Sequence, residues 1–225
     1  TSVTTALGSI KSKFMEVGST IAGVVTGGGI MAFGQKIIQV GRDFNDGMAR
    51  VHAVTQAGAD DMKMMSDEAK RLAEKYGGNA EKAYLAGLLH DITKNAPEAE
   101  HLKIFANFGI IPNEIEKGAE KLWHAMSGAA YVEHILGIKD PEIIDAIRYH
   151  TTAKANMSLL AKILYLADFT SADRDYEDVD VIREYVDESL QKAFVYALQY
   201  SIKDLVEQAR AVHLDTVAAY NEAVL

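Results

Sequence analysis

The sequence of 225 residues contains no cysteine, three prolines and one tryptophan, and its 23 Lys and Arg are outnumbered by 32 Asp and Glu. Without cysteine the chain can form no disulfide, no thiolate metal site and no thiol nucleophile. The net charge of −9 argues against duplex nucleic acid as the main partner, because neutralising phosphates requires clustered Lys and Arg. Any metal site must therefore be built from His, Asp and Glu, which suits iron, manganese, cobalt, zinc or magnesium.

Charge and glycine are unevenly distributed along the chain. Residues 1–61 carry five basic residues, five acidic residues and 10 of the 17 glycines, so the net charge lies in residues 62–225. The uncharged run from Gly18 to Gln35 has the minimum length of a membrane span, but it contains six glycines. Because glycine inside a helix costs roughly 1 kcal/mol relative to alanine, a flexible or packing-dependent segment is favoured over a membrane-active one or an ordinary helix pair. We do not expect a membrane partner.

A short sequence motif of the form D-F-x-x-x-M-x-x-V follows this run, and its defined positions are Asp43, Phe44, Met48 and Val51. Together with the Gly, Ala and Val-rich run, it resembles the N-terminal region of phage tail tape-measure proteins. The resemblance spans about residues 1–72 and implies a structural role in a long helical assembly. We expect residues 1–65 to form a glycine-rich helical extension and residues 66–225 to form a separate domain.

From about residue 66, apolar residues recur at helical spacing, and no window alternates every two residues. This pattern predicts an all-α fold. Gly77 and Gly137 mark helix ends, whereas Asp140 followed by Pro141 marks a helix start. The predicted helices are 69–76, 83–89, 119–136, 141–150, 159–167, 179–186, 190–209 and 216–224.

Five polar residues lie on or at the ends of these apolar helices: His90, Asp91, His124, His150 and Asp168. Singly, each histidine reads as a hydrogen-bonded core residue and each aspartate as a helix cap. Together they are costly to bury unless they are paired or bound to a metal, and several helices converging on one ion would satisfy them. Neighbouring helical residues point about 100° apart, so the first two could grip one ion and leave a carboxylate oxygen for a second. A divalent metal there would polarise a phosphoryl oxygen and lower the pKa of a bound water.

Four phrases carry a second resemblance: LLHDITK, KLWHAMSGAAY, AIRYHTTAKANMSLLAKILYLADF and AVHLDTVAAYN. They resemble the HD-domain phosphohydrolases, and in particular the YqeK-type symmetrical diadenosine tetraphosphate hydrolases of bacteria. The resemblance covers about residues 66–225 and implies an HD-domain helical bundle in the cytoplasm. It implies hydrolysis of a dinucleoside polyphosphate such as Ap4A to two ADP, with a pair of iron, manganese or cobalt ions.

The resemblance also implies roles for individual residues. The implied metal ligands are His90, Asp91, His124, His150 and Asp168. Asp91 would bridge the two ions, and Asp91 and Lys94 would be the catalytic residues. The implied substrate-binding residues are Lys94, Thr151, Thr152 and Arg174. The alternative reading of Lys94 and Arg174 is a pair of surface cations.

The sequence departs from the family pattern in two places. The family has a further His on the preceding helix where this chain has Asp61, and it usually has Gly where this chain has Ala153. Asp61 or Asp60 could serve as an oxygen ligand; otherwise one ion has an incomplete shell. Three functions therefore stay open: an active hydrolase, a nucleotide or metal binder without turnover, and a structural phage tail protein. A homodimer is also left open. His213 matches a phrase of the family, and the alternative reading is that it simply precedes the helix cap Asp215.

Overall fold

The computed structural model describes residues 59–225, and its side chains from Lys63 onward. The predictions for the glycine-rich extension and its tape-measure resemblance fall almost wholly outside these residues. The side chains of Asp60 and Asp61 also lie outside the described part. The boundary predicted at residues 65–66 stays a prediction; helix α3 begins a few residues before it, at Ala59.

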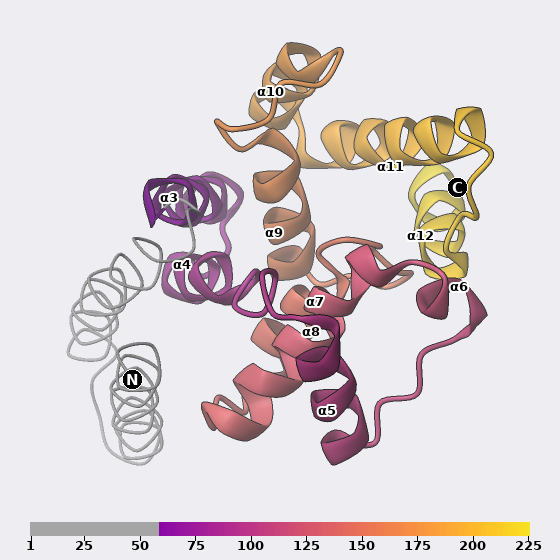
Figure 1. The fold of residues 1–225 in the computed structure, drawn as a ribbon. Coiled ribbons are helices and arrows are strands. Elements are labelled where there is room, and N and C mark those ends of the chain that lie inside the picture. Colours follow the sequence, from indigo (N-terminus) through magenta and orange to yellow (C-terminus); the bar gives the residue numbers. More distant parts are fainter. Residues whose placement is uncertain (1–58) are drawn as a thin grey trace.

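The described chain is built from helices and connecting loops, with no strand between residues 59 and 225 (Figure 1). The predicted all-α fold is confirmed. In chain order the elements are α3 (Ala59–Tyr76), α4 (Ala80–Leu89), α5 (Glu98–Phe108), α6 (Glu114–Lys117), the 3-10 turn η1 (Glu120–Leu122), α7 (Trp123–Ala130), the π-helical turn η2 (Tyr131–Ile135), α8 (Pro141–Tyr149), α9 (Leu159–Thr170), α10 (Val179–Glu188), α11 (Leu190–Glu207) and α12 (Leu214–Val224). Among these residues, no helix is both long enough and apolar enough to cross a bilayer.

The structure differs from the predicted helices in three ways. The segment predicted as one helix over 119–136 changes type twice, from η1 through α7 to η2. Helices α5 and α6 were not predicted, although their caps were readable: α5 ends at Gly109, whose φ is 67°, and α6 begins with a capping box of Asn113 and Glu116. Helix α12 is capped by His213 itself, whose Nδ1 accepts from the Asp215 N–H.

The main core surrounds α9, which runs between the α3–α4 pair on one side and α11 on the other (Figure 1). Its largest buried side chains come from every helix around α9. They are Leu72, Leu88, Leu89, Ile147, Ile163, Leu164, Leu166, Ile182, Phe194 and Leu198. A smaller cluster of Phe105, Trp123 and Met126 holds α5 against α7.

Gly87 lets α4 approach α3 closely. A Cβ added at this position would lie 2.9 Å from the Cα of Ser66, a distance that real side chains do not tolerate. The absence of a side chain therefore sets the separation of the two helices. Since His90 follows three residues later, this contact also helps to fix where the end of α4 lies.

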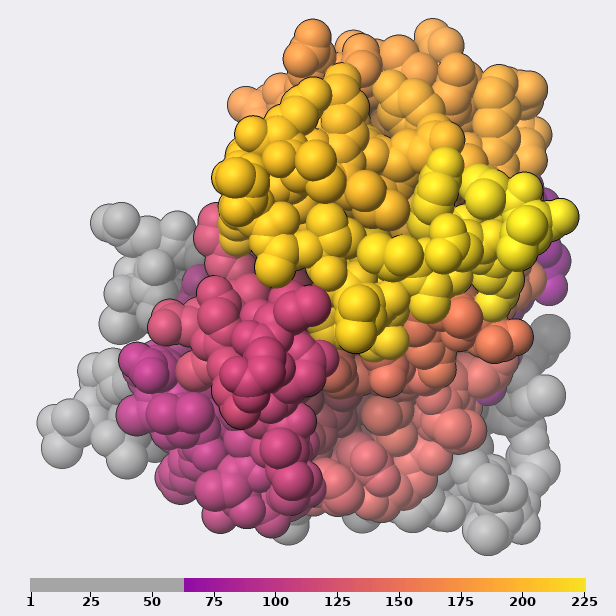
Figure 2. Space-filling view, turned by 90° about the vertical axis from the view of Figure 1, so that its right-hand side faces the viewer, coloured from indigo at the N-terminus to yellow at the C-terminus, as the bar shows by residue number. Residues whose placement is uncertain are grey.

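A buried ionic cluster joins α6, α8 and α12. The carboxylate of Glu116 accepts a hydrogen bond of 2.6 Å from Arg148, and the Nε2 of His213 lies 3.5 Å from the same oxygen. Figure 2 shows the face on which the C-terminal segment, in yellow, lies against the segment around α5 and α6, in magenta. Burial raises the pKa of Glu116, but the Asn113 N–H and the Arg148 guanidinium outweigh it, so the pKa lies below its usual range.

This cluster predicts an acid-sensitive contribution to stability. Because the folded-state pKa of Glu116 is depressed, the contribution is present above the unfolded-state pKa of about 4.3. It is lost as the pH falls toward the lower folded-state value. We expect Glu116→Gln to lower the free energy of unfolding at pH 7 by about 1–3 kcal/mol and to flatten its dependence on acidic pH, measured by urea unfolding.

Glu114→Gln is the matched control, because Glu114 lies on the same helix but is exposed, and within the described residues it pairs with the exposed Lys117. It should change the free energy of unfolding by less than about 0.5 kcal/mol. Equal effects of the two substitutions would contradict a specific role for the buried cluster.

Candidate metal centre

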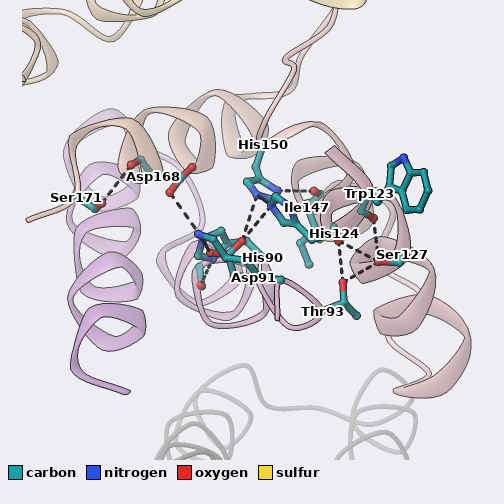
Figure 3. A network of polar contacts seen from close by, with 12 residues as sticks. His90, Asp91, Thr93, Trp123, His124, Ser127, Ile147, His150, Asp168 and Ser171 are labelled. Carbon is teal, nitrogen blue, oxygen red and sulfur yellow. Dashed lines mark hydrogen bonds and ion pairs between the residues drawn. The ribbon is translucent and has the colours of Figure 1, made fainter. Parts of the chain in front are cut away.

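Helix ends bring the five predicted ligands together. His90 caps the C-terminus of α4 and Asp91 follows it, His124 lies in the first turn of α7, His150 caps α8, and Asp168 lies in the last turn of α9. Helices α4, α8 and α9 contact one another, and α7 packs against α8. Figure 3 shows the side chains meeting in the space between these ends.

Two of the imidazoles are oriented in the same way by their own helices. The Nδ1 of His90 lies 2.7 Å from the Gly87 carbonyl oxygen, and the Nδ1 of His150 lies 2.7 Å from the Ile147 carbonyl oxygen. A carbonyl can only accept, so Nδ1 carries the proton in both rings. When either ring is neutral, its lone pair is therefore on Nε2, which faces Asp91 and can ligate a metal.

Asp91 lies at the centre of the cluster. Its Oδ1 is 3.2 Å from His124 Nε2 and 3.6 Å from His150 Nε2, whereas its Oδ2 is 3.2 Å from His90 Nε2. On the far side of His90, Asp168 Oδ1 lies 3.9 Å from the same Nε2. One oxygen of the Asp91 carboxylate therefore faces His124 and His150, and the other faces His90.

The nitrogen and oxygen atoms of this cluster are arranged better for binding a cation than for hydrogen bonding among themselves. Asp91 Oδ1 is buried and makes no well-formed hydrogen bond within the described residues, despite the nearby imidazoles. The Nε2 atoms of His124 and His150 lie 3.1 Å apart. Because the His150 proton is on Nδ1, this contact is a hydrogen bond only when His124 carries a proton on Nε2, and that proton would have to leave before His124 could ligate an ion through Nε2. Ligand atoms of His90, Asp91 and His150 lie within 4.8 Å of one another, as a group that could hold a metal ion. A divalent ion with nitrogen and oxygen ligands would satisfy all of these atoms.

The electrostatics keep the carboxylates ionised. Burial raises the pKa of Asp91, but the surrounding imidazoles, His90 foremost, outweigh it when they are protonated, and the pKa lies far below its usual range. Burial lowers the pKa of His90, but Asp91 and Asp168 outweigh it, so the pKa of His90 is raised. Burial also raises the pKa of Asp168, and His90 and Arg174 together lower it by more. For His150 the burial of the ring lowers the pKa, which favours the neutral form.

Two predicted cations flank the cluster. Lys94 Nζ lies 2.6 Å from Asp91 Oδ2, and half of its side chain is exposed. Arg174 donates from Nη2 to Asp168 Oδ1 at 2.7 Å and from Nε to the Asp168 carbonyl at 3.0 Å. Both are thus partly exposed groups in contact with the buried carboxylates, rather than isolated surface cations.

The two predicted threonines follow His150 directly. The hydroxyl of Thr152 donates to the Ala153 carbonyl, whereas the Oγ1 of Thr151 is buried without a hydrogen-bond partner among the described residues. Among the described residues, neither hydroxyl forms a hydrogen bond to the five clustered residues. Ala153 has a φ of 56°, in the left-handed region, which explains why glycine suits this position in the family that the sequence resembles.

The sequence reasoning missed a hydrogen-bonded network behind His124. The hydroxyl of Thr93 donates to the His124 carbonyl at 2.9 Å and lies 2.8 Å from Ser127 Oγ (Figure 3). Ser127 donates to the Trp123 carbonyl, and the buried His101 reaches Ser127 from α5. Thr93 is two residues from Asp91, so the network ties the two sides of the centre together. Only the position of Thr93 beside the His-Asp pair hinted at this role.

The comparisons identify the family. Residues 61–173, half of the chain, match the HD domain family. The chain therefore belongs to the HD domain family. The match begins beyond the glycine-rich segment, and the comparisons give no support to the tape-measure resemblance.

Several individual proteins and one solved structure are similar to this chain. The chain is 34% identical over 150 residues to a Bacillus subtilis protein named symmetrical bis(5'-nucleosyl)-tetraphosphatase, covering 67% of this chain and 80% of the relative. A protein of the same name from Halalkalibacterium halodurans is 34% identical, covering 68% and 82%. The fold matches a crystal structure from Clostridium acetobutylicum whose protein is described as a predicted HD superfamily hydrolase involved in NAD metabolism. The TM-score is 0.70 at 33% identity, covering 73% of this chain and 87% of that one.

The Thr93 network predicts an effect on metal affinity. Thr93→Val keeps the shape of the side chain but removes the donor to the His124 carbonyl, so the spacing of Asp91 and His124 should relax. We expect the affinity for Mn²⁺, measured by titration calorimetry, to fall by roughly ten-fold or more. Thr216→Val is the matched control, because its buried hydroxyl also donates to a carbonyl, that of Thr152. An unchanged affinity in Thr93→Val would refute this role.

Proposed function

We propose that this chain is a metal-dependent hydrolase that cleaves dinucleoside polyphosphates, with Ap4A cleaved symmetrically to two ADP. The observation that carries the proposal is the similarity to proteins that are named for this activity. Three of them are 31–34% identical to this chain, which covers 80–82% of their lengths. The matched region includes the candidate metal centre within residues 61–173.

The proposed cofactor is a pair of iron, manganese or cobalt ions. The residues that would hold the ions are Asp91, which lies among the others, and His90, His124, His150 and Asp168 around it. The buried Asp91 Oδ1, which has no hydrogen-bond partner among the described residues, supports this assignment. Bound ions supply Lewis acidity, which polarises phosphoryl oxygens and stabilises the charge that develops on them.

The remaining residues would bind and orient the polyphosphate. Lys94 pairs with Asp91 Oδ2 and half of its side chain is exposed, so its ammonium would be within reach of a phosphate at this edge of the cluster. Arg174 would donate to a phosphate beside Asp168, and Thr151 and Thr152 would line the pocket. The Thr151 hydroxyl has no hydrogen-bond partner among the described residues, whereas that of Thr152 donates to the Ala153 carbonyl. Hydrolysis consumes one water and breaks the central P–O–P bridge, and each half leaves as ADP. The net negative charge of the chain opposes such a substrate, so these local cations must offset it.

Release of ADP from Ap4A tests this function. We expect the chain supplied with Mn²⁺, Co²⁺ or Fe²⁺ to form two ADP per Ap4A, measured by chromatography. Asp91→Ala removes the carboxylate that lies among the other predicted ligands and should abolish product above background. Product formed equally by the two proteins, or absent from both, would defeat the proposal. Elemental analysis of the purified chain identifies the metal independently.

The substitution Asp61→His distinguishes two hypotheses: that the chain is an active enzyme, and that it binds metal without turnover because one ligand is missing. The family resemblance places a His where this chain has Asp61. If that loss weakens one ion site, Asp61→His should raise the affinity for Mn²⁺ and the rate of ADP formation together, by roughly ten-fold. A fall in both would instead assign the aspartate itself as a ligand. The homodimer, the cytoplasmic location and the exclusion of duplex nucleic acid stay predictions.

A further inference from the structure

The chain that follows α9 folds back over the last turn of that helix. The carbonyl groups at a helix C-terminus have no partner within the helix, and here side chains supply the donors. Arg174 donates to the Asp168 carbonyl at 3.0 Å, and the hydroxyl of Tyr176 donates to the Phe169 carbonyl at 2.9 Å. Arg183 donates from Nε to the Thr170 carbonyl at 3.3 Å. The turn of α9 that carries Asp168 is thus capped from beyond the helix.

Arg183 does more than cap the helix. From α10, its Nη2 donates to the carbonyl of Ser171 at 2.9 Å and to that of Arg174 at 3.1 Å. Its Nη1 is held by Asp180 at 3.1 Å, on the same helix. One planar guanidinium therefore joins the end of α9 to both ends of the tight turn over residues 171–174. Its positive charge also lies where a helix C-terminus favours a cation.

The guanidinium of Arg174 is only partly occupied by hydrogen bonds to Asp168. Its Nε and Nη2 bind Asp168, one of the predicted ligands, through the carbonyl and the carboxylate. Its Nη1 makes no hydrogen bond to the described residues, and the side chain is 37% exposed. A phosphate could therefore bind Nη1 while the contact with Asp168 persists, provided that the backbone of the turn stays in place.

We propose that Arg183 is a positioning residue that holds this turn, so that Arg174 stays between Asp168 and the phosphates of the substrate. The proposal rests on the proposed function. Arg183 itself is bonded to backbone carbonyls and to Asp180, so it acts through Arg174 rather than on the substrate. Arg183 donates to the carbonyls of Ser171 and Arg174 from α10, and it therefore restrains the backbone that carries Arg174. A lysine would replace it only in part, because an ammonium lacks the planar fork that reaches several carbonyls.

A double-mutant cycle between Arg183 and Arg174 tests the proposal. We expect Arg183→Gln to raise KM for Ap4A by roughly ten-fold and to lower kcat by less, and Arg183→Lys to recover only part of the loss. In an Arg174→Gln background, the same Arg183→Gln change should alter KM by less than about two-fold. The control is Arg71→Gln, since Arg71 binds Asp187 on α10 from outside this turn.

Two results would overturn the proposal. The first is an equal effect of Arg183→Gln on KM with and without Arg174, and the second is an equal rise in KM from Arg71→Gln, which would indicate a general loosening of α10. If the wild-type chain forms no ADP, the proposed function fails separately. The cycle is then measured as affinity for inorganic tripolyphosphate by calorimetry. There, weaker binding by Arg174→Gln with unchanged binding by Arg183→Gln would also overturn the role of Arg183.

Discussion

The charge of one buried carboxylate organises the second part of this chain. Asp91 is largely buried, and an uncompensated charge in that environment costs several kcal/mol. Imidazoles supplied by three different helix ends surround it, so the ends of α4, α7 and α8 must meet if the carboxylate is to remain ionised. Imidazoles alone compensate it imperfectly, because Asp91 Oδ1 has no hydrogen-bond partner among the described residues. A cation bound beside this oxygen would supply the missing interaction.

The rest of the fold serves to place these groups. The small residue Gly87 brings α4 close to α3, and the carbonyls of α4 and α8 orient their own terminal histidines. Thr93 connects the turn after Asp91 to α7. Side chains from beyond α9 secure its last turn. The centre is therefore fixed by backbone contacts on several sides, which lets charged groups lie together before any ligand binds.

Much of this could be read from the sequence, because strong local signals were present. Helical spacing and the Gly77, Gly137 and Asp140 signals gave most helix positions correctly, and the all-α class followed from them. The five polar residues stood out because each lies on or at the end of an otherwise apolar helix. The structure brings them together, while their roles as ligands stay a prediction.

Other features depend on contacts between residues far apart in the sequence, which no local pattern encodes. Helix α5 carries a mixed surface and is held by Trp123 and the smaller core cluster, so its apolar spacing alone was weak. His101 and Ser127 meet across 26 residues, and Arg183 reaches back to the end of α9. His213 illustrates the same limit: its phrase was recognised, but its role as a helix cap and its approach to Glu116 come from the tertiary structure.

The backbone turn at Ala153, just after His150, limits which substitutions this position can accept during evolution. Ala153 is fully buried, and its backbone lies in a region that side chains other than glycine adopt with strain. Its amide also donates to the Tyr149 carbonyl, so the turn is continuous with the end of α8. Drift at this position is therefore confined to the smallest residues. A larger side chain would have to unwind the helix end that presents His150, so an apparently remote change would reach the chemistry directly.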